Sequence, residues 1–111
     1  MRFGFHTFMV DPAELQDIAR AADACGWDSI QVADAPFFPE VISTPYPYTP
    51  DGTRFWPLDM PVLDPWVAIT AMAAVTNNIR FFPSVLRLAI RQPLLEAKSL
   101  CSVAAIAKDR V

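Results

Sequence analysis

The chain has 111 residues, of which 53% are hydrophobic and 19% are charged, and its formal net charge is −3. This composition is typical of a globular interior and excludes a disordered or collagen-like polymer. The acidic balance argues against nucleic acid as a partner. No uncharged apolar run reaches the roughly 18 residues of a membrane span, and the N-terminus lacks a signal-peptide cleavage site. We therefore expect a cytoplasmic protein without membrane contact.

A strand and a helix open the predicted order of elements. Residues 2–8 (RFGFHTF) predict the strand, and residues 10–26 predict the helix. Asp11 in the N-cap position and Pro12 in the first turn mark the helix start, and Gly26 suits the left-handed residue that closes a helix. The apolar face repeats with the helical period and consists of Leu15, Ile18, Ala19, Ala22 and Cys25.

A second strand, residues 29–33 (SIQVA), leads into a long segment without helical or strand periodicity, residues 35–64. Seven of the eleven prolines of the chain lie in this segment. It is also too rich in aromatic and apolar side chains for a solvated linker. A loop of this length inside a compact domain is usually functional, because packing must order its backbone. We interpret it as an insertion in a single domain that spans residues 1–111.

The strand and helix alternation resumes after this loop. Asp64 and Pro65 predict the start of a second helix, which runs to about residue 78. Residues 79–86 (IRFFPSVL) predict a third strand, and residues 92–108 predict a third helix. Residues 109–111 (DRV) are typical of the entry into a fourth strand. The face predicted to be buried on the third helix consists of Leu94, Ala97, Cys101 and Ala104.

The two cysteines are predicted to be buried small hydrophobes and not a disulfide or metal-binding pair, because each lies on the apolar side of a helix. The chain has a single histidine, so it cannot assemble a His-rich metal site, and we predict no metal site. Charge is uneven along the chain. Residues 1–64 hold ten acidic and three basic side chains, and residues 65–111 hold two acidic and six basic ones. Each segment is therefore expected to meet a complementary neighbour.

The alternation of strands and helices predicts an α/β fold with parallel strands and right-handed crossovers. A doubly wound nucleotide-binding sheet needs a glycine-rich turn after its first strand, and residues 6–14 (HTFMVDPAE) contain no glycine. A (β/α)8 barrel, or TIM barrel, places its phosphate site after the seventh and eighth strands. The sequence therefore favours the barrel. Because a complete barrel takes roughly 250 residues, the chain is expected to be an N-terminal portion with about three of eight units.

Two polar residues are predicted to lie where strands end, which is where barrels of this kind place their catalytic groups. Asp34 follows the second strand, and it either acts in catalysis or caps the turn that follows it. His6 lies near the end of the first strand, and it either faces a cofactor or is a structural, hydrogen-bonded histidine.

Five stretches of the chain, taken together and in this order, resemble the luciferase-like monooxygenase family, and within it the deazaflavin-dependent oxidoreductases. They are GWDSIQVAD, PYPYTPDG, LDPWVAITAMAAVTNNIRF, SVLRLAIRQPLLEAKSL and DRV. The resemblance implies a barrel with an inserted loop after the second strand. It also implies that FMN or the deazaflavin coenzyme F420 binds at the C-terminal mouth of that barrel.

The resemblance also assigns roles to individual positions. Asp34 matches the active-site acid, but Ala35 replaces the histidine that many relatives use for proton transfer. The peptide between Ser84 and Val85 matches a non-proline cis bond that forms a bulge against the cofactor ring. The alternative is an ordinary strand end with Val85 packed in the core.

Other side chains are candidates for contacts with substrate or cofactor. Arg87 and Arg91 follow the third strand, where they either meet an anionic tail of the cofactor or are solvated or packed on a helix. Aromatic residues of the long loop either wall a substrate pocket or only pin the loop down. These are Tyr46, Tyr48, Phe55 and Trp56.

These observations predict an oxidoreductase or monooxygenase that acts on a small organic substrate through hydride transfer or oxygen activation by the cofactor ring. We expect the full-length form to be a homo-oligomer and the chain alone to be inactive. A non-catalytic relative or a truncated gene remnant is the alternative, which Ala35 and the incomplete barrel favour.

Overall fold

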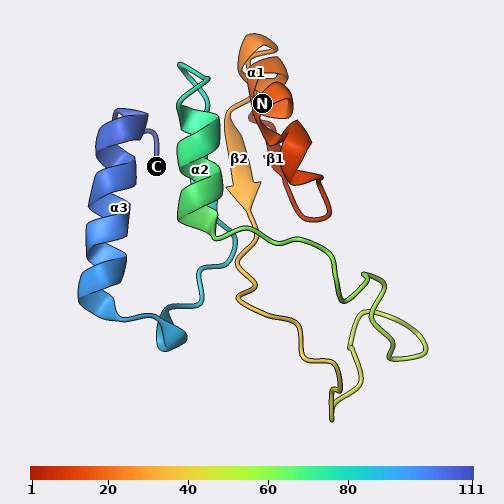
Figure 1. Ribbon diagram of the computed structural model, residues 1–111. Coiled ribbons are helices and arrows are strands. Elements are labelled where there is room, and N and C mark those ends of the chain that lie inside the picture. Colours follow the sequence, from red (N-terminus) through yellow and green to blue (C-terminus); the bar gives the residue numbers. More distant parts are fainter.

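The structure is a computed structural model that describes all of residues 1–111, and its three strands form one parallel sheet in the order β1, β2, β3. Three helices lie side by side in a single row, each following its strand (Figure 1). The predicted alternation is thereby confirmed. The elements are β1 (Gly4–His6), α1 (Leu15–Ala24), β2 (Ser29–Val32), α2 (Pro65–Ala73), β3 (Arg80–Pro83) and α3 (Pro93–Ala107).

The helix starts follow the signals in the sequence. The Asp11 side chain accepts a hydrogen bond from the Ala13 backbone N–H, and a short 3-10 turn at Pro12–Glu14 delays the start of α1 to Leu15. Asp64 caps α2 by accepting from the N–H of Trp66 at 2.9 Å. Each cap satisfies amide groups that a helix leaves without a partner at its first turn.

The core lies between the sheet and the row of helices. Ile30 and Phe81 are partners in the register of β2 and β3, and both are fully buried beneath α2. The register places His6, Gln31 and Phe82 together on the opposite face of the sheet, which no helix covers. A doubly wound sheet needs apolar side chains on both faces, whereas a barrel lines its interior with this second face.

The predicted buried face of α3 is wrong, and so is the predicted burial of the two cysteines. Leu94 is 78% exposed, and both Cys25 and Cys101 are exposed free thiols. The face of α3 that packs on α2 instead contains Val103 and Ala107. Because α3 is apolar on nearly all sides, its periodicity does not determine which side makes the contact.

Arg110 ties the C-terminal ends of α2 and α3 to the sheet. Its guanidinium donates to the carbonyl oxygens of Ala73, Thr76, Ile79 and Ala107 and to the Thr76 hydroxyl. Phe81 N–H donates to the Arg110 carbonyl at 2.7 Å. Residues 109–111 therefore run along the free edge of β3, although they form no strand.

The chain has no helix or strand between Val32 and Pro65, and this segment extends away from the helix row as a long excursion (Figure 1). It leaves the sheet at the edge where the strands end. None of the three helices combines the length and the apolar character that crossing a membrane requires.

Asp23, at the end of α1, fixes the turn between α2 and β3. Its carboxylate accepts from the backbone N–H groups of Asn77, Asn78 and Ile79 at 2.7 to 3.0 Å. Burial raises the pKa of Asp23, but these hydrogen bonds outweigh that effect and hold the pKa below its ordinary value, with a smaller contribution from the charge of Arg110.

We expect Asp23→Asn to lower the free energy of unfolding by about 1–3 kcal/mol at neutral pH, because an amide replaces a charged acceptor of three hydrogen bonds. The pKa is depressed in the folded state. The stabilisation is therefore complete above the unfolded value of about 3.8 and is lost as pH falls through the lower folded value. Urea unfolding of the complete gene product should show the gap between wild type and variant closing below about pH 4.

The control for this prediction is Asp17→Asn, because Asp17 is an exposed residue of the same helix. Its pair with Arg20 lies at the surface, so we expect a change within about 0.5 kcal/mol at every pH. A gap for Asp23→Asn that stays constant down to pH values of about 2 would contradict the assigned role.

Candidate active site

The candidates from three different strands converge at the edge of the sheet where the strands end. His6 is the last residue of β1, Asp34 lies two residues beyond β2, and Ser84 directly follows β3. Both the 35–64 loop and the connection between β3 and α3 begin at this edge (Figure 1). Parallel strands bring their carboxyl ends together, so the convergence follows from the topology.

The structure brings His6 and Ser84 into contact. His6 Nδ1 accepts a hydrogen bond from the Phe8 N–H at 3.1 Å, and His6 Nε2 lies 3.4 Å from the Ser84 carbonyl oxygen. Because Nδ1 accepts, a neutral ring carries its proton on Nε2 and donates to Ser84. This contact fixes the position of the His6 ring at the end of β1.

The Ser84–Val85 peptide is cis, as the family resemblance implies. Val85 is 75% exposed, so the alternative in which it packs in the core is wrong. Phe82, three residues before Val85 and 43% exposed, lies on the same face of the sheet as His6 and Gln31. His6, Gln31 and Phe82 form an open surface on this face, and the exposed Val85 follows at its carboxyl edge, one residue beyond Ser84. We call these four residues the ring platform.

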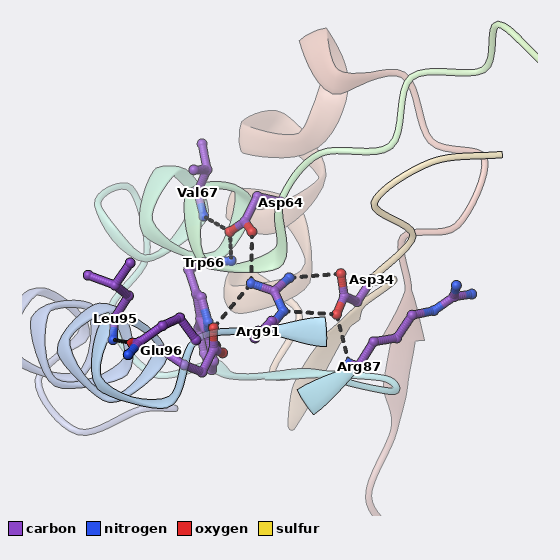
Figure 2. Close-up of polar contacts among 9 residues, drawn as sticks. Asp34, Asp64, Trp66, Val67, Arg87, Arg91, Leu95 and Glu96 are labelled. Carbon is purple, nitrogen blue, oxygen red and sulfur yellow. Dashed lines mark hydrogen bonds and ion pairs between the residues drawn. The ribbon is translucent and has the colours of Figure 1, made fainter. Parts of the chain in front are cut away.

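Asp34 belongs to a separate cluster of charges (Figure 2). Its Oδ1 accepts from Arg91 Nη2 at 2.8 Å, and its Oδ2 accepts from Arg91 Nε at 3.3 Å and from the Arg87 backbone N–H at 2.8 Å. Arg91 Nη1 also donates to Asp64 at 3.2 Å and to Glu96 at 3.1 Å. One guanidinium thus joins three carboxylates, and this carboxylate cluster connects the end of β2 with the first turns of α2 and α3.

The cluster is largely removed from solvent. The Asp34 side chain is 2% exposed and that of Arg91 is 17% exposed. The hydrogen bonds to Asp34 raise the pKa of Arg91 above its ordinary value; burial opposes this effect, and Asp64 and Glu96 add to it. Arg91 therefore stays charged at every pH at which the protein is folded. Of the two predicted roles for Arg91, the structure shows the contact with helices.

The contacts of Asp34 bear on its two predicted roles, catalysis and capping of the turn that follows β2. Its backbone partner is the N–H of Arg87, in the connection after β3, and not an amide of the turn that follows β2. The alternation of Ile30, Val32 and Asp34 turns this carboxylate to the helix side of the sheet, away from the ring platform. The sequence did not indicate that Asp64 and Glu96 would join Asp34 around Arg91.

The aromatic residues of the long loop pack mainly on one another. The Trp56 ring is the centre of this cluster, and Phe8 joins it from the segment after β1. Tyr48 is exposed, and Tyr46 is its one aromatic partner. The centroid distances from Trp56 are 4.9 Å to Phe55, 5.0 Å to Tyr46, 5.6 Å to Phe8 and 5.7 Å to Phe38. The rings therefore hold the loop near the end of β1.

The geometry defines a class of protein: parallel strand–helix units of a (β/α)8 barrel, with the polar candidates at the carboxyl ends of the strands. Comparison with known proteins agrees. The oxygenating constituent of 3,6-diketocamphane monooxygenase from Pseudomonas putida, solved in complex with FMN, aligns with 99% of this chain at a TM-score of 0.72 and 20% identity. The monooxygenase RslO1 from Streptomyces bottropensis aligns with 99% at a TM-score of 0.70 and 22% identity. The chain covers 28% and 31% of these two proteins.

The sequence profile of the luciferase-like monooxygenases matches residues 2–111, and the chain belongs to this family. Its predicted fold class, the N-terminal part of a luciferase-like barrel, is confirmed. The uncharacterized protein Rv0940c of Mycobacterium tuberculosis is 39% identical over the entire chain, and Rv0953c of the same organism is 30% identical over 84% of it. The chain spans 38% and 33% of the lengths of these relatives.

Proposed function

We propose that the complete protein is an oxidoreductase that uses a flavin or deazaflavin ring, and that this chain supplies part of the surface on which the ring lies. The observation that carries the proposal is the ring platform, where exposed apolar side chains and polar groups lie at the carboxyl edge of the sheet. Family membership supports it, as does the FMN complex of the Pseudomonas putida protein.

The residues of the platform fit a tricyclic ring. Phe82 and Val85 offer exposed apolar contact to the face of a flat ring, and Gln31 and His6 offer polar groups beside it. When bound, reduced FMN would supply oxygen activation and reduced coenzyme F420 would supply a hydride. His6 would keep the Ser84 carbonyl in place, and the Val85 side chain would keep water from one face of the ring.

We propose a positioning role for Asp34. Its carboxylate faces Arg91 and the Arg87 N–H on the helix side of the sheet, so it holds the connection from Val85 to Arg91 in place. Ala35, at the position where many relatives carry a histidine, has no titratable side chain to act beside Asp34. Proton transfer to the substrate is then a task for a group other than Asp34 and residue 35.

Titration of the complete gene product with FMN and with coenzyme F420, followed by the absorbance of the ring, tests the proposal. We expect one of the two to bind and Val85→Asp to weaken binding about 10-fold, because the charge would lose solvent when the ring covers it. Val67→Asp, at an exposed valine of α2, is the matched control and should leave binding unchanged.

Oxygen consumption with reduced FMN, or reduction of an acceptor by reduced coenzyme F420, then identifies the reaction. A protein that binds neither ring, or in which Val85→Asp has no effect, would contradict the proposal. The first of these outcomes would support the alternative, a non-catalytic relative, which is motivated by Ala35.

A further inference from the structure

The inner side of the long loop forms a cleft with a volume of about 350 Å³. Aromatic and apolar side chains make up much of its wall, among them Phe37, Phe38, Tyr46 and Trp56. Arg87, from the connection between β3 and α3, is its one lining residue outside the loop. The cleft therefore lies between the loop and the same connection that carries Val85.

The charged side chains that line the cleft are two arginines, Arg54 and Arg87, with no acidic residue among them. The Arg54 guanidinium donates to the carbonyl oxygens of Pro39 and Glu40, so it is held in place by the loop backbone. The Arg87 guanidinium has no hydrogen bond or ion pair, and in Figure 2 it points away from the carboxylate cluster. The long loop contains several acidic residues, but none of them lines the cleft. The wall of the cleft is therefore positively charged.

Trp56, which forms part of the aromatic wall, carries an unpaired polar group. Its indole N–H is buried and has no hydrogen-bond acceptor. A buried donor without a partner costs free energy. The cleft itself combines a free cation at Arg87 with a large aromatic wall.

We propose that this cleft binds the substrate and that the substrate class is a small organic acid with an apolar or aromatic body. The carboxylate lies at Arg87, where a guanidinium can bind both of its oxygens, and the body lies against Tyr46 and Trp56. This inference deepens the proposed function, because it assigns a substrate class to the edge of the sheet that carries the ring platform.

The test compares binding of 4-phenylbutyrate and of its neutral analogue 4-phenylbutyramide to the cofactor-free complete gene product, by calorimetry. We expect the acid to bind about 10-fold or more tightly than the amide, because a hydrogen bond to a charged group is stronger than one between neutral groups. Arg87→Met should remove this preference, and Arg87→Lys should retain part of it. Arg20→Met, which removes the same charge from the exposed face of α1, should retain the full preference.

Equal binding of the acid and the amide by the wild-type protein would overturn the proposal, and so would a preference that persists in Arg87→Met. A third outcome assigns Arg87 to the cofactor. If Arg87→Met lowers the affinity for FMN but not for riboflavin, which lacks the phosphate, then the guanidinium binds the cofactor tail and the proposal is wrong. Since the acid is tested without cofactor, failure here is distinct from failure of flavin binding.

Discussion

Arg91→Met is expected to lower the free energy of unfolding of the complete gene product by about 3–5 kcal/mol, because it leaves a buried carboxylate without its cation. Asp34 is 2% exposed and would keep only the Arg87 N–H as a partner. Asp64 and Glu96, which share the same guanidinium, would add repulsion. Methionine keeps much of the volume of the arginine stem, so the loss reports mainly on charge. Urea denaturation near neutral pH measures it.

Two further variants separate this effect from packing. Arg87→Met is the same change four residues earlier, at an exposed guanidinium without a partner, and should cost less than about 0.5 kcal/mol. Adding Asp34→Asn to Arg91→Met should recover part of the loss, since a neutral amide removes the unpaired charge. An Arg91→Met protein as stable as Arg87→Met would show that the cluster does not stabilise the fold.

The order of elements was predictable because each boundary has a local chemical cause. Asp11 and Asp64 cap helices within two residues of themselves, and Gly26 adopts the positive φ of 74° that closes α1. The contact face of α3 was not predictable in the same way. Its side chains are apolar nearly all round, so only the position of α2 decides that Val103 is buried and Leu94 is exposed.

The location of the candidates at one edge also followed from the sequence, since parallel strands end together. The sequence also contains a signal that separates Asp34 from the ring platform. Ile30, Val32 and Asp34 occupy every second position, so the acid faces the same side of the sheet as the two core residues. The charge asymmetry gave a second signal, because Arg91 pairs with Asp34 and Asp64 from the acidic part of the chain. No local pattern links residues 57 positions apart, so the partners themselves were not identified.

Asp34→Asn is expected to lower turnover by about 10- to 100-fold in whichever reaction the complete protein catalyses, while KM changes less. An asparagine amide cannot accept from Arg91 and the Arg87 N–H with both of its polar atoms. The connection that carries Val85 would then shift relative to His6 and Phe82. Because Asp34 is buried on the helix side of the sheet, we expect the pH profile of kcat/KM to keep the wild-type shape.

The matched control is Asp64→Asn, which alters another carboxylate on the same guanidinium, 41% exposed and without contact to the Arg87 N–H. We expect its turnover to fall less than about 3-fold, because solvent replaces the lost contact. If Asp34→Asn instead removes one ionisation from the pH profile of kcat/KM, then Asp34 exchanges a proton with the substrate, and the positioning role is wrong. Unchanged turnover in Asp34→Asn would restrict the carboxylate cluster to stabilising the fold.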